Sequence, residues 1–252
     1  MFPQTSANHT PTAPFVILSS VESTNNYAMA KLHVGMVDHG FCFLALEQSA
    51  GRGQRGKQWL SKPGENITMS SVFAPEMKSP SQLFTFPFLL SASMALGCYD
   101  FIKDLGISAV SIKWPNDLYI GDRKAGGILI ENNYKGDAWH RSVVGTGVNI
   151  NQVDFSEAAG KPVSLKMVTG KQYDVVKLGK KLFAHLLKRY ETIDGSTMKE
   201  YNGLLYRKGE EVRMKKDNIV FTARIDHVSE SGELVTAGPV ERRFKVGEVE
   251  FV

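Results

Sequence analysis

A glycine-rich, basic loop at residues 51–59 is the part of the sequence best suited to bind an anion. It runs Gly-Arg-Gly-Gln-Arg-Gly-Lys-Gln-Trp. Glycine has no Cβ, so its backbone turns sharply and can come close to a ligand. Arg52, Arg55 and Lys57 place cationic donors beside exposed backbone N–H groups, a combination that suits phosphate or carboxylate. The loop therefore predicts an anion-binding site.

A Walker A nucleotide loop is the first alternative, because Gly51, Gly56 and Lys57 fit G-x-x-x-x-G-K. Two features argue against it. Gln58 stands where that motif needs a Ser or Thr hydroxyl for Mg²⁺. Residues 63–64 (Pro-Gly) also predict a turn where the motif would open a helix. A solvated basic turn without a ligand is the other alternative for the loop taken alone.

A second polar cluster, residues 113–117 (Lys-Trp-Pro-Asn-Asp), lies at the end of a predicted strand. Pro115 interrupts the strand ladder and keeps the residue before it extended. We therefore expect Lys113, Asn116 and Asp117 to point into a cleft. A capped surface turn with a salt bridge is the alternative.

Paired glycines occur in two further predicted strands. Lys124 precedes Gly126-Gly127-Ile128, and residues 145–149 (Gly-Thr-Gly-Val-Asn) end at Asn149. Glycine in a strand often marks the close approach of a ligand or another backbone, although bulges explain many such pairs. Both strands are therefore candidates for a binding site.

Ser23-Thr24-Asn25 could form a helix cap or offer hydroxyl and amide groups to a polar ligand. Gln48, just before the glycine loop, is ambiguous in the same way. The sequence pattern leaves both interpretations open.

Bulk properties exclude several classes of protein. The 252 residues suffice for one large and one small domain, and 42% apolar with 22% charged residues is typical of globular proteins. A net charge of +4 does not by itself indicate nucleic-acid binding. No apolar run approaches membrane-spanning length, and no signal pattern opens the chain. The two cysteines, Cys42 and Cys98, are expected to be buried thiols in a reducing cytoplasm.

Apolar periodicity predicts alternating strands and helices in the first two hundred residues. Strands are predicted at 15–19, 41–47, 66–73, 110–114, 118–120, 126–131 and 142–150. Helices are predicted at 23–34, 81–105 (with Pro87 in its first turn or kinking it) and 173–192, and a loop at 154–168.

The character of the sequence changes near residue 206. Five short predicted strands follow, at 211–214, 219–228, 233–237, 240–246 and 248–252. Such a run indicates a small SH3-like barrel. We therefore expect a polar, poorly ordered segment at 1–14, a main domain at 15–205 and a C-terminal domain at 206–252.

Taken in order, these motifs resemble the biotin–protein ligases, also called biotin–acetyl-CoA-carboxylase synthetases. The resemblance covers about residues 15–252. It is carried by residues 23–25, Gln48, the glycine loop with Trp59, the Lys-Trp-Pro-Asn-Asp-Leu string, Lys124 to Glu131, and residues 145–149. It implies an α+β fold with a mixed, mainly antiparallel sheet and flanking helices, like that of class II aminoacyl-tRNA synthetases, plus the small barrel.

The resemblance also implies a reaction and its residues. Biotin and ATP, with Mg²⁺ on the phosphates, would give biotinyl-5′-AMP. A lysine of a biotin carboxyl carrier protein would then accept the biotin. The implied catalytic residues are Lys124, Arg52, Lys113 and Asp117. The implied biotin-binding residues are Ser23, Thr24, Asn25, Gln48, Gly51, Arg52, Gly53, Gln54, Lys124, Gly127 and Ile128. The implied nucleotide-binding residues are Arg52, Arg55, Trp59, Lys113, Asn116, Lys124 and Asn149. No protein ligand for a metal ion is assigned.

One residue departs from the family pattern. Gln54 stands where the commonest form has Arg, so one anion contact is weaker or is shared with Arg55 and Lys57.

Three other functions remain as alternatives. A lipoate–protein ligase or octanoyl transferase resembles the same fold and also acylates a lysine. A biotin-dependent repressor is disfavoured, because the residues before Phe15 leave no room for a helix-turn-helix. A non-catalytic binding module is the third. We expect a cytoplasmic protein without nucleic-acid or membrane partners, with a homodimer through exposed sheet edges as a possible assembly.

Overall fold

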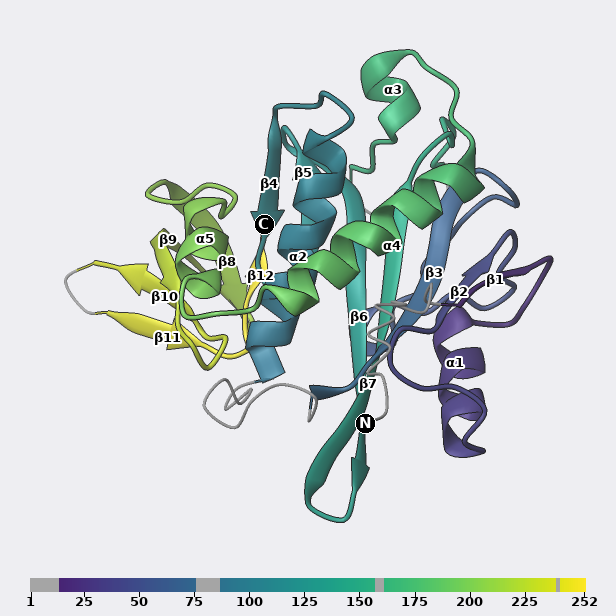
Figure 1. Cartoon of the computed structure of the whole chain (residues 1–252). Coiled ribbons are helices and arrows are strands. Elements are labelled where there is room, and N and C mark those ends of the chain that lie inside the picture. Colours follow the sequence, from purple (N-terminus) through teal and green to yellow (C-terminus); the bar gives the residue numbers. More distant parts are fainter. Residues whose placement is uncertain (1–13, 76–86, 157–160, 239–240) are drawn as a thin grey trace, which may run out of the picture.

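The computed structural model describes residues 14–75, 87–156, 161–238 and 241–252 (Figure 1). Outside these ranges lie residues 1–13 of the predicted poorly ordered segment, residues 81–86 of the predicted 81–105 helix and residue 240 of the predicted 240–246 strand. In the rest of the chain, an α+β architecture is confirmed, with two separate sheets and helices packed against the larger one.

The larger sheet has seven strands, and all neighbours are antiparallel except β1 and β2. In spatial order the strands are β1 (Phe15–Leu18), β2 (Cys42–Ala45), β3 (Asn66–Phe73), β7 (Ala138–Asn149), β6 (Arg123–Lys135), β5 (Asp117–Ile120) and β4 (Val110–Lys113). The hairpin of β6 and β7 extends beyond the other strands (Figure 1) and is longer than the sequence predicted.

The central strands are buried on both faces, because adjacent residues of each strand enter different cores. On β3, for example, Phe73 joins the large core while Val72 joins a smaller one. Successive side chains of a strand point to opposite faces, so the two cores lie on opposite sides of the sheet. This explains why β2 and β3 consist of buried residues throughout.

Three helices cover these two faces. α1 (Thr24–His33) packs on the smaller core, while α2 (Pro87–Lys103) and α4 (Val175–Glu191) pack on each other over the large one (Figure 1). The amphipathic pattern of α4 buries Leu182 and Leu186, and Asp174 caps its first turn. Within the described ranges, no helix is long and apolar enough to cross a membrane.

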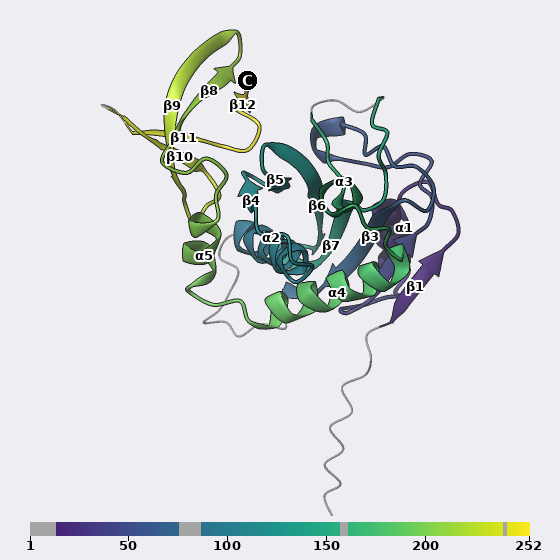
Figure 2. The same cartoon turned by 90° about the horizontal axis from the view of Figure 1, so that it is seen from above.

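The C-terminal strands form a second, fully antiparallel sheet beside β4 and β5 (Figure 2). In spatial order they are β11 (Arg242–Phe244), β10 (Leu234–Ala237), β9 (Ile219–Val228), β8 (Glu211–Lys216) and β12 (Glu250–Phe251). A segment at residues 204–206 enters this sheet after running along β4, with backbone hydrogen bonds to Ile112 on both sides. The two sheets are therefore joined at the β4 edge.

Two short helices were not predicted. The loop expected at 154–168 is wrong from Leu165 onward, because α3 (Leu165–Thr169) forms there. Ser164 caps it by accepting from the Met167 N–H, and Gly170 ends it in the left-handed region. α5 (Thr197–Gly203) follows α4.

Candidate active site

A cleft of about 760 Å³ lies where the glycine loop, the strand ends of the large sheet and the end of the second sheet meet. Every site residue predicted from the sequence lines it except Gly51. Segments far apart in the sequence therefore converge on one cavity. Gly51 is buried at the base of the loop, and a Cβ added to it would sit 2.4 Å from the Trp59 carbonyl oxygen.

The glycine loop is a narrow hairpin rather than the start of a helix. Arg52 and Gln58 form a β-bridge, and the Gly53 N–H donates to the Lys57 carbonyl at 2.7 Å. A single 3₁₀ turn, η1 (Gln54–Gly56), forms the tip, with Arg55 in the left-handed region at φ 57°. A Walker A loop is thereby excluded, because the chain is extended at Lys57, where that motif would begin an α-helix.

Arg52 is tethered across the mouth of the cleft. Its Nη1 lies 3.0 Å from Oε1 of Glu131 on β6 and 2.7 Å from Oδ1 of Asn26 on α1. The guanidinium keeps further donors, and the side chain is 46% exposed. It can therefore bind an anion while Glu131 holds its position.

Lys124 and Asp117 form an ion pair at the floor of the cleft. The Lys124 Nζ lies 2.6 Å from Asp117 Oδ1 and 5.9 Å from the centroid of the Trp59 ring. Asp117 pairs with Gly127 across β5 and β6, and a register shift follows between Leu118 and Tyr119. Because of this register shift, the Lys124 side chain on β6 can reach the Asp117 side chain on β5.

Lys113 lies in an aromatic cage. Its Nζ is 3.2 Å from the Tyr119 hydroxyl, 5.0 Å from the centroid of that ring, and 4.6 Å from the centroid of Phe251 on β12. Burial lowers the pKa of Lys113, and the neighbouring Asp117 opposes this shift. Burial also raises the pKa of Tyr119 to about 12, so its hydroxyl stays protonated at neutral pH.

The backbone between Lys113 and Asp117 is fixed by three polar contacts. Trp114 donates its indole N–H to the Gly232 carbonyl of the second sheet, and the Tyr201 hydroxyl donates to the Pro115 carbonyl. Asn116 donates its amide to the Ile128 carbonyl. The alternative of a capped surface turn is therefore excluded, since Asn116 is buried and the segment lines the cleft, as the sequence predicted.

One end of the cleft carries a largely buried network of neutral hydroxyls and amides, which is anchored to the Glu131 carboxylate. Gln48 Oε1 accepts from the backbone N–H and the hydroxyl of Thr24, at 2.8 and 3.0 Å. Ser70 donates to Asn25 Oδ1 at 2.6 Å, and Asn25 donates to Glu131 at 2.8 Å. These hydroxyls and amides hold one another in place beside the cavity.

The sequence left open whether Ser23 caps the first helix or faces a ligand, and its surroundings favour the second interpretation. Ser23 occupies the N-cap position of α1, but within the described part of the chain its side chain makes no capping hydrogen bond. It is only 2% exposed and lines the cleft. Its hydroxyl is therefore available to a polar ligand rather than used by the helix.

The indole of Trp59 packs against Gly147 of β7. A Cβ added to Gly147 would sit 2.5 Å from Trp59 Cε2, so only glycine permits this contact. Trp59 Nε1 and Thr146 Oγ1 are buried and have no hydrogen-bond partner among the described residues. Both residues line the cleft, where a ligand could satisfy these two polar atoms.

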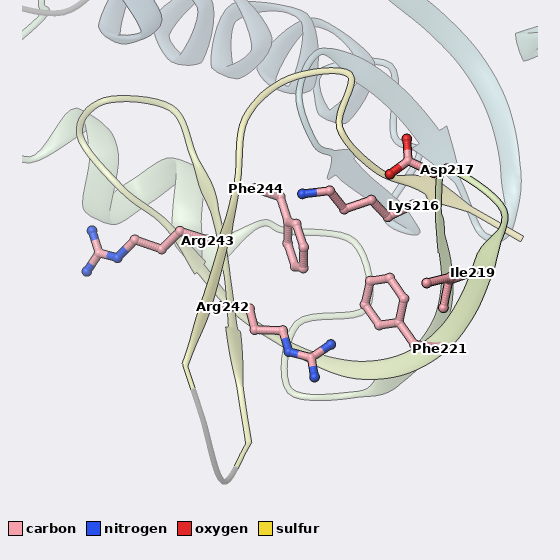
Figure 3. A pocket seen from close by; sticks show the side chains of 7 residues that line it. All are labelled: Lys216, Asp217, Ile219, Phe221, Arg242, Arg243 and Phe244. Atoms are coloured by element: carbon pink, nitrogen blue, oxygen red, sulfur yellow. The ribbon is translucent and has the colours of Figure 1, made fainter.

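The second sheet contains another hollow, of about 530 Å³, between β8, β9 and β11 (Figure 3). Phe221 and Phe244 face each other across it, under the cations of Arg242 and Lys216. None of the predicted site residues lines this hollow. In neither cavity, nor elsewhere in the described ranges, do three or more His, Cys, Asp or Glu side chains gather as metal ligands.

Comparison with known proteins identifies the family. The model of the biotin/lipoate A/B protein ligase family matches residues 17–149, more than half of the chain. The chain belongs to this family. The matched range contains the glycine loop, Lys113 to Asp117, Lys124 and Asn149.

Two curated relatives illustrate the extent of the similarity. The bifunctional ligase/repressor BirA of Escherichia coli is 36% identical over 135 residues, which cover 53% of this chain and 40% of that protein. The chain therefore matches well under half of that relative's length. The biotin–[acetyl-CoA-carboxylase] ligase of Paracoccus denitrificans is 27% identical over 238 residues, covering 90% of this chain and 95% of the relative.

Solved structures of the family share the fold. A biotin protein ligase from Aquifex aeolicus, in complex with biotin and ATP, superimposes with a TM-score of 0.78 at 23% identity, covering 95% of this chain and 98% of the other. A biotin protein ligase from Leishmania major, in complex with biotin, gives 0.65 at 19% identity, covering 94% and 100%. Both alignments extend over nearly the whole chain, including the second sheet.

The sequence did not identify three residues that line the cleft or hold its side chains. Glu131, which positions both Arg52 and Asn25, was noted only as part of a motif. Tyr119 and Phe251, which enclose Lys113, were not noted at all. The Lys-Trp-Pro-Asn-Asp string could have pointed to Tyr119, two residues further on. Nothing local in the sequence indicates Phe251.

Proposed function

We propose that the protein is an ATP-dependent ligase that forms biotinyl-5′-AMP and transfers biotin to a lysine of a biotin carboxyl carrier protein. The observation that carries this proposal is the polarity of the cleft. The neutral polar side chains of the buried Ser23 and Thr24 and the half-buried Gln48 share one cavity with the cations Lys113 and Lys124. Biotin has a matching polarity, with a neutral ureido ring at one end and a carboxylate at the other.

In the first step, a biotin carboxylate oxygen attacks the α-phosphorus of ATP, and the bond to pyrophosphate breaks. The carboxylate is already ionised and needs no base. It needs cations that offset its repulsion from the triphosphate and stabilise the transition state. We assign Lys124 and Arg52 to the carboxylate and the α-phosphate, and Lys113 and Arg55 to the remaining phosphates. Mg²⁺, held mainly by phosphate oxygens, would neutralise further charge there.

The nucleotide is expected beside Trp59, Asn116 and Asn149. The side-chain amides of the two asparagines already donate hydrogen bonds within the protein. Asn149 donates to the Val163 carbonyl, and Asn116 donates to the Ile128 carbonyl. These two side chains therefore shape the pocket, and the unpartnered Trp59 Nε1 remains as a donor.

In the second step, the ε-amine of the acceptor lysine attacks the acyl carbon of the mixed anhydride, and AMP leaves. The amine must lose a proton to become nucleophilic. Asp117 is the carboxylate in the cleft nearest to Lys124, so it can orient this amine and accept its proton.

The buried polar network favours biotin over lipoate. A ureido ring donates two hydrogen bonds and accepts others, which suits the hydroxyls and amides of Ser23, Thr24 and Gln48. The dithiolane ring of lipoate lacks these groups and would leave buried polar atoms without partners, at about 1–3 kcal/mol each. Asn25, Gly53, Gln54, Gly127 and Ile128 complete the proposed biotin site.

Finer features belong to the same proposal. We assign residues 15–205 to a catalytic domain and 206–252 to an SH3-like domain, supported by the separate second sheet. Two buried free cysteines support a cytoplasmic setting. A homodimer would pair through the β1 edge, because residues 204–206 already cover β4. The absence of a nucleic-acid partner stays a prediction.

Biotin-dependent ATP–pyrophosphate exchange tests the proposal. We expect exchange with biotin and none with lipoate or octanoate, followed by transfer to a carrier protein on its addition. Exchange with lipoate but not biotin would replace the proposal with the lipoate alternative. No exchange with any of these acids would refute adenylation.

A further inference from the structure

The last strand of the protein contacts a cation of the cleft. β12 places the centroid of the Phe251 ring 4.6 Å from Lys113 Nζ, which also lies 3.2 Å from the Tyr119 hydroxyl. A lysine held by an aromatic ring on one element and a hydroxyl on another loses rotational freedom, and the ring adds cation–π attraction. The position of Lys113 therefore depends on a strand that belongs to the other sheet.

The turn before this strand contacts a second cation. Gly247 has φ +91°, and a Cβ added there would lie 3.0 Å from the Arg55 guanidinium carbon. The Arg55 side chain thus lies directly on the Gly247 backbone. Arg55 itself occupies the left-handed region, which non-glycine residues adopt only at a cost. This contact fixes the tip of the glycine loop against the second sheet.

We propose that residues 247–251 are a positioning element of the active site, in which Phe251 holds Lys113 and Gly247 seats Arg55. This inference rests on the proposed adenylation reaction, in which both cations bind ATP phosphates. It makes phosphate binding depend on the docking of the second sheet. Neither Phe251 nor Gly247 needs to touch a substrate for this role.

The test compares Phe251→Leu with wild type in biotin-dependent pyrophosphate exchange. The variant keeps an apolar side chain but removes the ring face. We expect the KM for ATP to rise about ten-fold, in line with the loss of one cation–π contact, while the KM for biotin stays within about two-fold of wild type. Phe251→Tyr keeps the ring and should restore the KM for ATP. Gly247→Ala should raise the same constant, because its Cβ crowds the Arg55 guanidinium and its backbone is strained at φ +91°.

Phe244→Leu is the matched control. Phe244 belongs to the same sheet and also lies under a lysine, with Lys216 Nζ 5.9 Å from its ring centroid, but it lines the separate hollow (Figure 3). We expect this variant to lower thermal stability while leaving the KM for ATP unchanged. The control therefore distinguishes a general destabilisation of the second sheet from the specific loss of the contact that positions Lys113.

Three results would overturn the inference. One is an unchanged KM for ATP in Phe251→Leu. Another is an equal rise in Phe244→Leu, and the third is a fall in kcat alone that Phe251→Tyr does not reverse. Each of these results can be read only if the wild-type protein catalyses biotin-dependent pyrophosphate exchange. Failure of the wild type itself would instead refute the proposed function.

Discussion

Gly147→Ala is the sharpest test of how the cleft is built. The new methyl group would sit 2.5 Å from Cε2 and 2.6 Å from Cζ2 of the Trp59 indole. Carbon atoms in favourable contact are about 3.5–4.0 Å apart. The indole must therefore retreat from the floor by about 1 Å, because Gly147 is held in the middle of the sheet by both β3 and β6.

The expected loss follows from that displacement. Misplacing a group of the reacting complex by about 1 Å can reduce the rate about 100-fold, which corresponds to about 2.7 kcal/mol of transition-state stabilisation. Trp59 is proposed to contact the nucleotide, so we expect this loss in kcat/KM for ATP. Global stability should change less, since the indole is only partly buried and can move outward.

The assay is biotin-dependent pyrophosphate exchange on a double-mutant cycle. In the background of Trp59→Leu, which removes the indole, Gly147→Ala should cost less than about three-fold. The difference between the two backgrounds measures the interaction between residues 147 and 59. Gly203→Ala is the control, because a Cβ at Gly203 meets no atom within 4 Å.

Two outcomes would refute the reasoning. If Gly147→Ala reduces activity equally in both backgrounds, the clash with the indole is not the cause. If Gly147→Ala retains full activity, the position of Trp59 does not matter to the reaction.

Three further predictions address the cations and the scaffold. Lys124→Gln should reduce kcat/KM in pyrophosphate exchange about 10²–10³-fold, while its melting temperature stays near that of wild type, because a pair 37% exposed on the lysine side contributes less than about 1 kcal/mol. Since burial lowers the pKa of Lys113, its charge is lost as the pH rises through a value below that of an ordinary lysine. Lys113→Arg should therefore move the alkaline limb of the exchange profile to higher pH, and an unmoved limb would contradict this. Arg189→Leu should lower the free energy of unfolding in urea by about 2–3 kcal/mol, because this side chain bonds carboxylates of both α2 and α5.

Most of the larger sheet could be predicted because its signals are local. β3 was predicted with its observed bounds, Asn66–Phe73, from an unbroken apolar and small-residue run. α2 is described from Pro87 and ends at Lys103, two residues before the predicted end. α3 was missed although its cap at Ser164 and its stop at Gly170 are both visible in the sequence. A five-residue helix is too short to show an apolar period.

The cleft was predicted less completely, for a physical reason. Residues such as Lys124 and Asn116 stand in motifs whose spacing is itself informative. Phe251 and Gly247 act only through contacts with segments far away in the sequence, and these contacts exist because residues 204–206 dock the second sheet on β4. No local pattern encodes such docking.

The pairing of the cations links the two steps of the proposed reaction. Arg52 and Lys124 are each held by a carboxylate, Glu131 and Asp117, at 3.0 and 2.6 Å. An incoming anion therefore competes with protein carboxylates for both cations. In the proposed reaction, Lys124 would turn to the substrate carboxylate and α-phosphate when these bind, and Asp117 would then have given up its ion pair with Lys124 by the time the mixed anhydride has formed, with Lys113 still nearby. A free carboxylate beside the anhydride is what the acceptor amine requires, since it can orient the amine and take its proton. The same ion pair thus keeps Asp117 occupied before adenylation and makes it available afterwards.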